Sequence, residues 1–208
     1  MLLLDGPITF REAMANEPTP LAFVFREVLL FLAHRGDVVL FGSHAVNAYV
    51  DDERLTQDID ILALRGARLA EEIRDLLAGK FHIATRVREA VPGIGCRVYE
   101  LRKPKNRHLV DVRQVAQLPT AVDVEGVPVL NPPELVAMKV LGMAERLGRP
   151  KAGTDRVDIQ RLLLRFPELK SVEGVVSERL RELGASPTTL ELWEGVATEP
   201  LEPDRDDY

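Results

Sequence analysis

The sequence predicts a mixed α/β fold, in which a mixed sheet flanked by helices is followed by a C-terminal helical half. Strand-like apolar runs alternate with helical patterns as far as about residue 130. From Pro132 onward only helical periodicity remains. We therefore divide the chain into an α/β core with N-terminal helices (1–130), a helical subdomain (131–196) and an acidic tail that we expect to be disordered (197–208).

The composition is that of an ordinary globular protein, with 46% hydrophobic and 29% charged residues. No apolar run approaches the ~20 residues that a membrane-spanning helix needs. The start, M-L-L-L-D-G, lacks the basic leader and long apolar run of a signal peptide. The single cysteine, Cys96, excludes an intramolecular disulfide and is interpreted as a small strand residue. We expect a cytoplasmic protein with no membrane partner.

Charge is distributed unevenly along the chain, whose formal net charge is −6. Between Arg74 and Gln114, ten Lys or Arg residues stand against Asp75, Glu89, Glu100 and Asp111, a balance of +6. A positive middle on a negative protein is compatible with a polyanionic ligand. The alternative is a solvated face of exposed strands.

The pattern of apolar residues, turn residues and caps places the elements of the first half. In chain order we expect a helix capped by Thr9 that ends before Pro18, a helix from Pro20 to His34, a strand from Val38 to Phe41, a short helix from His44 to Val50, a strand carrying Asp58 and Asp60, a helix from Arg65 to Gly79, strands from Phe81 to Glu89, Cys96 to Lys103 and His108 to Val115, and a hairpin around Glu125-Gly126. The three consecutive strands should form an antiparallel meander.

The second half is expected to be helical throughout. The predicted helices run from Pro132 to Leu147, Asp155 to Phe166, Val172 to Leu183 and Pro187 to Val196, with Asn131, Thr154, Ser171 and Ser186 as their N-caps. Trp193 is interpreted as packing the last helix down rather than as a platform for bases.

One strand–helix–strand unit carries the strongest signal for a site. Gly42 and Ser43 end a strand where a helix begins, so backbone N–H groups there can face an anion. Asp58 and Asp60 alternate with Ile59 and should point to the same side of their strand. Two neighbouring carboxylates repel each other unless a cation lies between them, and a hard divalent cation is the usual one. The unit therefore predicts a metal–nucleotide site.

Asp111 is the best candidate for a third carboxylate. It lies among valines in a strand expected to belong to the same sheet, and an unpaired carboxylate is costly to bury. Three converging carboxylates would hold one or two Mg²⁺ ions. The alternative is a salt bridge with one of the many nearby arginines. Asp123 is a weaker substitute because it approaches a turn.

A basic pair on the first C-terminal helix forms a second candidate. Lys139 and Arg146 share one face of an otherwise apolar helix, with Gly142 between them. Asp155 and Asp158 share a face of the next helix. The basic face could bind a phosphate, or the acids could pair with the two cations and brace the helices; both can hold at once.

These residues together resemble the nucleotidyltransferase superfamily, with the polymerase-β-like fold. The resemblance lies in Gly42-Ser43, in Arg54-x-Thr56-x-Asp58-Ile59-Asp60 and in a later strand aspartate. The stretches P-P-E-L-V-A-M-K-V-L-G-M-A-E-R and T-D-R-V-D-I-Q-R-L-L resemble the AbiEii-type branch, the toxin partner of abortive-infection toxin–antitoxin pairs. The chain departs from that pattern at Thr154, where the family often has Lys, and in the acidic insert Asp51-Asp52-Glu53.

The resemblance implies a role for each matched residue. Asp58 and Asp60 would bind the metal ions, and Asp111 would complete the site and help activate the acceptor hydroxyl. Ser43 and the backbone at Gly42 would contact the phosphates of a nucleoside triphosphate. Arg54 and Thr56 are further candidates for phosphate contact; the alternatives are that Arg54 lies on the loop without a role and that Thr56 caps a turn. Lys139 would lie near the triphosphate, with Arg146, Asp155 and Asp158 as support.

The function predicted from the sequence is that of an NTP-dependent, metal-dependent nucleotidyltransferase that acts on an acceptor hydroxyl. It would use ATP or another NTP with two Mg²⁺ ions and transfer NMP to an RNA, a tRNA end or a protein. A cognate antitoxin would be its partner if the resemblance extends to biology. The alternatives are transfer to a small molecule such as an aminoglycoside, and a catalytically silent module that binds nucleotide or RNA.

Overall fold

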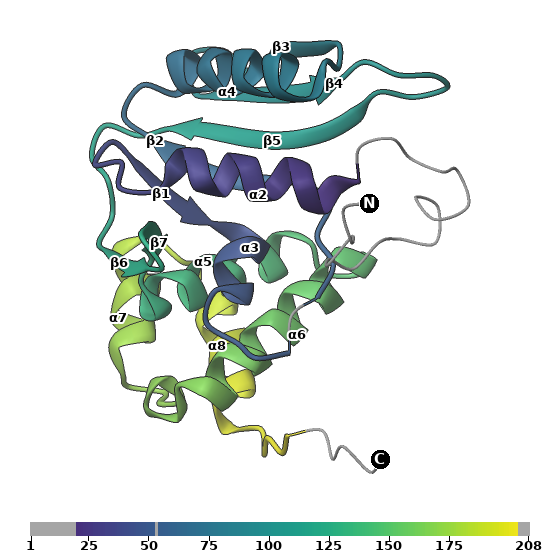
Figure 1. The fold of residues 1–208 in the computed structure, drawn as a ribbon. Coiled ribbons are helices and arrows are strands. Elements are labelled where there is room, and N and C mark those ends of the chain that lie inside the picture. Colours follow the sequence, from purple (N-terminus) through teal and green to yellow (C-terminus); the bar gives the residue numbers. More distant parts are fainter. Residues whose placement is uncertain (1–19, 53, 204–208) are drawn as a thin grey trace. The chain divides into compact units, whose positions relative to one another are not determined.

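The computed structural model describes residues 20–52 and 54–203 and has the mixed α/β fold that the sequence predicts (Figure 1). The chain groups into two compact units. Of the described residues, 20–44 and 54–129 form the sheet unit, and 45–52 and 130–203 form the helical unit. The helix expected between Thr9 and Pro18 lies outside the described residues.

The sheet unit is built on seven strands in the order β3-β4-β5-β2-β1-β7-β6. Their bounds are β1 (Val38–Phe41), β2 (Ile59–Ala63), β3 (Thr85–Val91), β4 (Gly95–Glu100), β5 (Arg107–Gln114), β6 (Ala121–Val124) and β7 (Val127–Leu130). β3, β4 and β5 form the expected antiparallel meander, and β1 also pairs antiparallel with β2. β2 pairs with β5, and β1 with β7, in parallel. The sheet is therefore mixed, as predicted.

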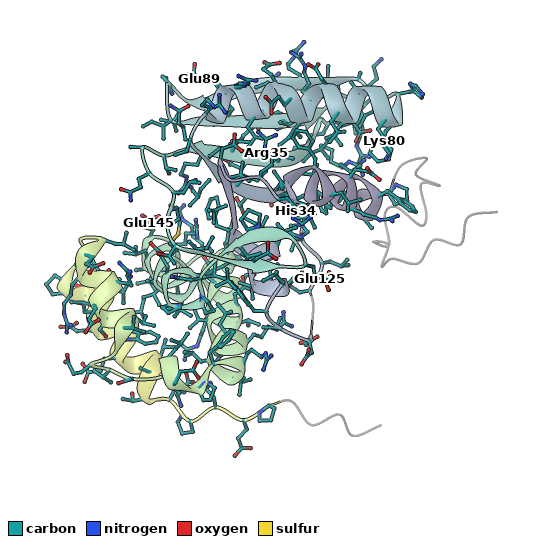
Figure 2. The ribbon with its side chains drawn as sticks, turned by 60° about the vertical axis from the view of Figure 1, so that its left-hand side comes forward. His34, Arg35, Lys80, Glu89, Glu125 and Glu145 are labelled. Carbon is teal, nitrogen blue, oxygen red and sulfur yellow. The ribbon has the colours of Figure 1, made fainter. Side chains whose placement is uncertain are left out.

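Helices α2 (Leu21–Leu32) and α4 (Gly66–Phe81) belong to the sheet unit, and α4 packs along β3, β4 and β5 (Figure 1). Arg35, in the segment after α2, and Lys80 of α4 are both labelled in Figure 2 and contact acidic residues across these two elements. Arg35 donates to Glu72 of α4 at 3.1 Å, and Lys80 lies 2.7 Å from Glu27 of α2. The side chains of Val98, Val110 and Val112 are fully buried on the strands beside α4. The apolar core of this unit thus lies between α4 and one face of the sheet.

The helical unit contains α5 (Pro132–Glu145), α6 (Pro150–Arg165), the 3₁₀ turn η1 (Pro167–Leu169), α7 (Val175–Glu182) and α8 (Pro187–Thr198). Two predicted caps are confirmed. Asn131 accepts from the backbone N–H of Glu134, and Ser186 accepts from that of Thr189. Trp193 is buried and donates to Ser177 at 2.9 Å, in agreement with its predicted packing role.

Several predicted helix boundaries are wrong. The short helix α3 (Gly42–Asn47) begins at Gly42 rather than at His44. α4 passes through Gly79 and ends at Phe81, because packing outweighs the cost of about 1 kcal/mol that glycine brings to a helix. This extension moves the start of β3 from Phe81 to Thr85.

Two predicted caps in the helical unit are also wrong. α6 begins at Pro150, whose fixed φ suits the first helical position, so Thr154 lies inside the helix. The N-cap of α7 is Gly174 rather than Ser171. At the C-terminus α8 extends to Thr198, residues 199–203 form no helix or strand, and 204–208 lie outside the described residues. None of the described helices has the length and apolar character that a membrane span requires.

Candidate functional site

Asp60 and Asp111 lie side by side on two parallel strands. Asp60 of β2 and Asp111 of β5 are direct partners in the strand pairing. Their neighbours Ile59, Ile61 and Val110 are fully buried, so the alternation of a strand directs both aspartates to the opposite face. The sheet therefore brings together two carboxylates that are 51 positions apart in the chain.

The sequence analysis placed Asp58 inside the strand that carries Asp60. In the structure Asp58 comes directly before β2, which begins at Ile59. Its Oδ2 lies 3.1 Å from Nδ1 of His108. The sequence analysis did not single out His108, because a regular β5 strand would turn it away from Asp111. A bulge changes the pairing between β4 and β5, so that Val98 pairs with Val110 while Tyr99 pairs with His108. The bulge turns the imidazole toward Tyr99 and Asp58.

Asp111 has a basic partner across the sheet. Nε of Arg97, the residue directly opposite on β4, donates to Oδ2 of Asp111 at 3.0 Å. Asp111, followed by the phenolic oxygen of Tyr99, raises the pKa of Arg97 above its ordinary value. The salt bridge considered in the sequence analysis is therefore present, and Arg97 is a second residue that sequence reasoning did not identify. The signal was the excess of arginines in this stretch, which did not indicate which one faces Asp111.

Gly42 packs directly against the Asp60 carboxylate. Its φ is +73°, a conformation that favours glycine. A Cβ added at this position would lie 2.1 Å from Oδ2 of Asp60. Only glycine therefore allows the turn after β1 and the Asp60 carboxylate to approach each other this closely.

The loop before β2 is tied to the start of α3. Arg54 donates to the Ser43 hydroxyl at 2.5 Å, and the Thr56 hydroxyl lies 2.5 Å from Nε2 of His44. Burial lowers the pKa of His44 to about 4, with Asp58 opposing the shift and Arg54 adding to it. At neutral pH His44 is thus an uncharged imidazole, and the predicted phosphate-contact residues Ser43, Arg54 and Thr56 lie around it.

The remaining predicted residues lie in the helical unit. Lys139 donates to Asp158 at 2.6 Å and to Asp155 at 3.4 Å, and Arg146 donates to the other oxygen of Asp155 at 2.7 Å. Gly142 leaves room for Arg146, because a Cβ there would lie 2.6 Å from its Nη1. The contacts match the bracing arrangement considered in the sequence analysis. A phosphate role for Lys139 stays a prediction.

The donor chemistry of the sheet unit suits a hard cation. Mg²⁺ is commonly bound through one or two carboxylates together with substrate phosphates and water, and Asp58 and Asp60 supply two. Residues 20–52 and 54–203 contain no group of three or more His, Cys, Asp or Glu side chains arranged to hold a metal ion. The residues thus fit a cation bound by two carboxylates and a substrate. A preformed set of three ligands is not seen among them.

No protein-family model matches the sequence, and a search of curated proteins found no match. Solved structures do match the fold. The Megavirus polyadenylate synthase aligns with a TM-score of 0.59 and 14% identity over 76% of this chain and 34% of its own. JHP933 from Helicobacter pylori aligns with a TM-score of 0.60 and 13% identity over 92% of this chain and 82% of its own.

A further H. pylori protein, provisionally named a nucleotidyltransferase, aligns with a TM-score of 0.58 and 14% identity over 85% of this chain and 80% of its own. The chain spans about a third of the Megavirus enzyme and most of the two bacterial proteins. At these identities the likeness establishes a nucleotidyltransferase-like fold.

Proposed function

We propose that the chain is a metal-dependent nucleotidyltransferase that moves NMP from a nucleoside triphosphate to an acceptor hydroxyl. The observation that carries this proposal is the apposition of Gly42, Asp60 and Asp111, which joins a glycine turn to two neighbouring carboxylates. The likeness in fold to a polyadenylate synthase and to a protein named a nucleotidyltransferase supports the same reaction class.

In the proposed reaction the acceptor oxygen forms a bond to the α-phosphorus, and the bond from that phosphorus to the bridging oxygen of the β-phosphate breaks. Pyrophosphate leaves, and Asp111 would take the hydroxyl proton. Asp58 and Asp60, with Asp111, would hold Mg²⁺, which when bound neutralises charge on the triphosphate oxygens. Ser43, Arg54 and Thr56 would contact the phosphates.

Two basic residues, Lys139 and Arg97, have narrower roles in the proposal. Lys139 would add charge near the triphosphate, as the resemblance to the AbiEii-type branch implies. Nε of Arg97 forms an ion pair with Oδ2 of Asp111 at 3.0 Å. Arg97 would have to release that carboxylate before Asp111 could accept a proton or contact a cation. Arg97 is half exposed, which makes such an exchange inexpensive.

The acceptor in this proposal is an RNA, such as a tRNA end, or a protein. The same resemblance makes the chain a candidate toxin with a cognate antitoxin. Induced expression would then arrest growth, and the Asp60→Asn variant would not. Normal growth at equal protein level would contradict the toxin role and leave the transferase proposal standing.

A small cationic acceptor is the alternative within the same reaction class. It would favour an acidic site, and Asp51 and Asp52 are exposed. Asp52, however, accepts from Arg161 at 2.7 Å, which offsets part of that charge. A silent binding module is the alternative outside the enzyme class.

The decisive experiment follows a label from the triphosphate. The purified chain is incubated with Mg²⁺ and each of the four α-³²P-labelled NTPs, together with cell RNA, lysate protein or an aminoglycoside panel. We expect one class of acceptor to become covalently labelled. Asp60→Asn and Asp111→Asn should reduce labelling by roughly a hundredfold or more, because they remove carboxylates that would hold the Mg²⁺ needed to neutralise charge on the transferring phosphoryl group.

The matched control is Asp75→Asn, which removes an exposed carboxylate from α4. This variant should label the acceptor at the wild-type rate. Label incorporation that is equal in Asp60→Asn and wild type would contradict the proposal. Triphosphate binding without labelling of any acceptor would favour the silent module.

A further inference from the structure

A row of charged residues crosses four strands and ends at the predicted site. Arg88 of β3 pairs with Arg97 of β4, Arg97 pairs with Asp111 of β5, and Asp111 pairs with Asp60 of β2. Directly opposite residues share a face of the sheet. The row covers three strand spacings of roughly 4.8 Å, or about 14 Å from the edge strand to Asp60.

Arg86 and Tyr99 extend this row into a surface, and Arg113 borders it. Arg86 pairs with Tyr99, which in turn pairs with His108. Arg113 lies two residues beyond Asp111, on the same side of β5. The buried valines that alternate with these residues face α4, so the arginines occupy the other face. We call the surface formed by Arg86, Arg88, Arg97, Tyr99 and Arg113 the arginine face.

The charge of the arginine face is only partly neutralised. Arg86, Arg88 and Arg113 are exposed. Among the residues that the structure describes, Arg86 and Arg88 have no carboxylate within salt-bridge distance, although the chain as a whole is acidic. Within the row, Arg97 forms an ion pair with Asp111. Positive charge therefore increases with distance from the carboxylates, toward the edge strand.

Flat groups are stacked along the same path. The rings of His108 and Tyr99 lie with centroids 5.1 Å apart, and the guanidinium of Arg88 lies 5.8 Å from the centre of the Tyr99 ring. The guanidinium of Arg113 lies 5.3 Å from the centre of the Phe41 ring. Bases of single-stranded RNA stack on aromatic rings and on guanidinium planes. An acidic peptide would use the charge but not these planes.

We propose that the arginine face binds the single-stranded end of an RNA and leads its terminal hydroxyl to Asp60 and Asp111. The inference rests on the proposed function for the role of that hydroxyl, but RNA binding itself does not depend on catalysis. Arg86 and Arg88 bind phosphates at the edge strand, and Tyr99 positions a base nearer to the carboxylates. RNA binding would explain the excess of basic residues between positions 74 and 114, for which the sequence analysis left two interpretations open.

The test is binding of a fluorescent single-stranded oligoribonucleotide, measured by anisotropy over a range of salt concentrations without NTP. Two double variants are compared. Arg86→Ala with Arg88→Ala removes two charges from the arginine face, and Arg65→Ala with Arg68→Ala removes two exposed charges at α4. We expect the first to weaken binding and to reduce the salt slope by roughly 1.4, because each single-strand phosphate contact contributes about 0.7. The second should bind like the wild type.

Tyr99 supplies a test of stacking that charge does not affect. Tyr99→Leu should weaken binding by roughly 5- to 150-fold, the range for loss of one stacked base, whereas Tyr99→Phe should retain most of it. Equal losses in the two arginine double variants, or no loss in either, would overturn the proposal. So would labelling of a protein acceptor with RNA binding unaffected by the face variants.

Transfer is scored separately, with the same RNA carrying either a free 3′-hydroxyl or a 3′-phosphate. Labelling of the first RNA alone, lost in the Arg86/Arg88 variant, supports both proposals. Binding that depends on the arginine face without labelling of either RNA would contradict the transferase and leave the arginine face established. If the Arg86/Arg88 variant still labels RNA at the wild-type rate and binds it with wild-type affinity, the transferase proposal stands. RNA binding by the arginine face would then be contradicted.

Discussion

Charged residues gather in two regions of this chain, and the two differ in how far water reaches them. In the helical unit Asp158 is fully buried and Lys139 nearly so. In the sheet unit the side chains of Asp58 and Asp111 keep 35% and 20% of their exposure. Both regions contain paired aspartates with basic partners, so residue type alone does not separate them.

The difference in burial indicates different roles for the charged residues of the two regions. A buried pair that loses one partner leaves a charge that water cannot reach, so it holds its helices together and is costly to break. Carboxylates that water still reaches exchange one partner for another at lower cost. The sheet unit is therefore suited to binding a cation and a substrate, and the helical network to bracing α5 against α6.

The largest effect is expected from Lys139→Met. It removes the ammonium 2.6 Å from Asp158 and keeps most of the apolar volume. We expect a loss of about 3–5 kcal/mol in the free energy of unfolding, because a buried carboxylate loses its counter-charge. Urea denaturation without nucleotide measures this loss and excludes any contribution from a phosphate role of Lys139.

Lys80→Met is the matched control, since it breaks the more exposed pair with Glu27. That variant should lose at most about 1 kcal/mol. Adding Asp158→Asn to Lys139→Met should restore part of the stability, as a double-mutant cycle would measure. If Lys139→Met cost no more than Lys80→Met, burial would not separate the two regions.

Local patterns predicted what local forces decide. Asn131 before Pro132 indicated a helix start, and the cap is present. Gly42-Ser43 indicated a turn beside the acidic strand, and Gly42 does pack on Asp60. The mixed sheet also followed from the order of apolar runs, because alternation and turn residues are read along a few positions.

Contacts between residues far apart in the chain determine the features that the sequence analysis did not predict. The bulge in β5 that turns His108 toward Asp58 depends on the register with β4. The choice of Arg97 as the partner of Asp111, from among ten basic residues, depends on the same register. The extension of α4 through Gly79 depends on packing against the sheet and α2. Each of these features joins residues whose contact no local pattern encodes.

A second, intermediate effect concerns pH and His44. Burial sets its pKa at about 4 in the folded chain, below the ordinary 6.5, so the unfolded chain binds more protons between these values. Stability should therefore fall as the pH is lowered from 6.5 to 4, by up to about 3 kcal/mol at 1.36 kcal/mol per pKa unit. The measurement compares unfolding of the wild type and His44→Asn in metal-free buffer across this range.

Other groups titrate in the same range, so the informative quantity is the difference between the two curves. The control is His82→Asn, which removes an exposed imidazole and leaves the surroundings of His44 intact. It should follow the wild-type curve, and His44→Asn should lose less stability on acidification. Parallel curves for wild type and His44→Asn would mean that the sheet unit tolerates charge at His44 as readily as at its carboxylates.

The smallest of the three effects on stability, and the most informative about the site, is expected from Gly42→Ala. The variant strains a backbone with φ of +73° and sets a Cβ against Oδ2 of Asp60. We expect a loss of about 2 kcal/mol in the free energy of unfolding, together with loss of nucleotidyl transfer, because the Asp60 carboxylate must move.

Gly93→Ala separates the strain from the contact. Its φ is +70°, but a Cβ there would meet nothing within 4 Å, so it should cost about 1 kcal/mol and leave transfer unchanged. The difference between the two variants reports the contact between the turn and Asp60. If Gly42→Ala kept transfer while losing as much stability as Gly93→Ala, Asp60 would not need its position against the turn. The contact between Gly42 and Asp60 would then serve the structure of the sheet unit and not its chemistry.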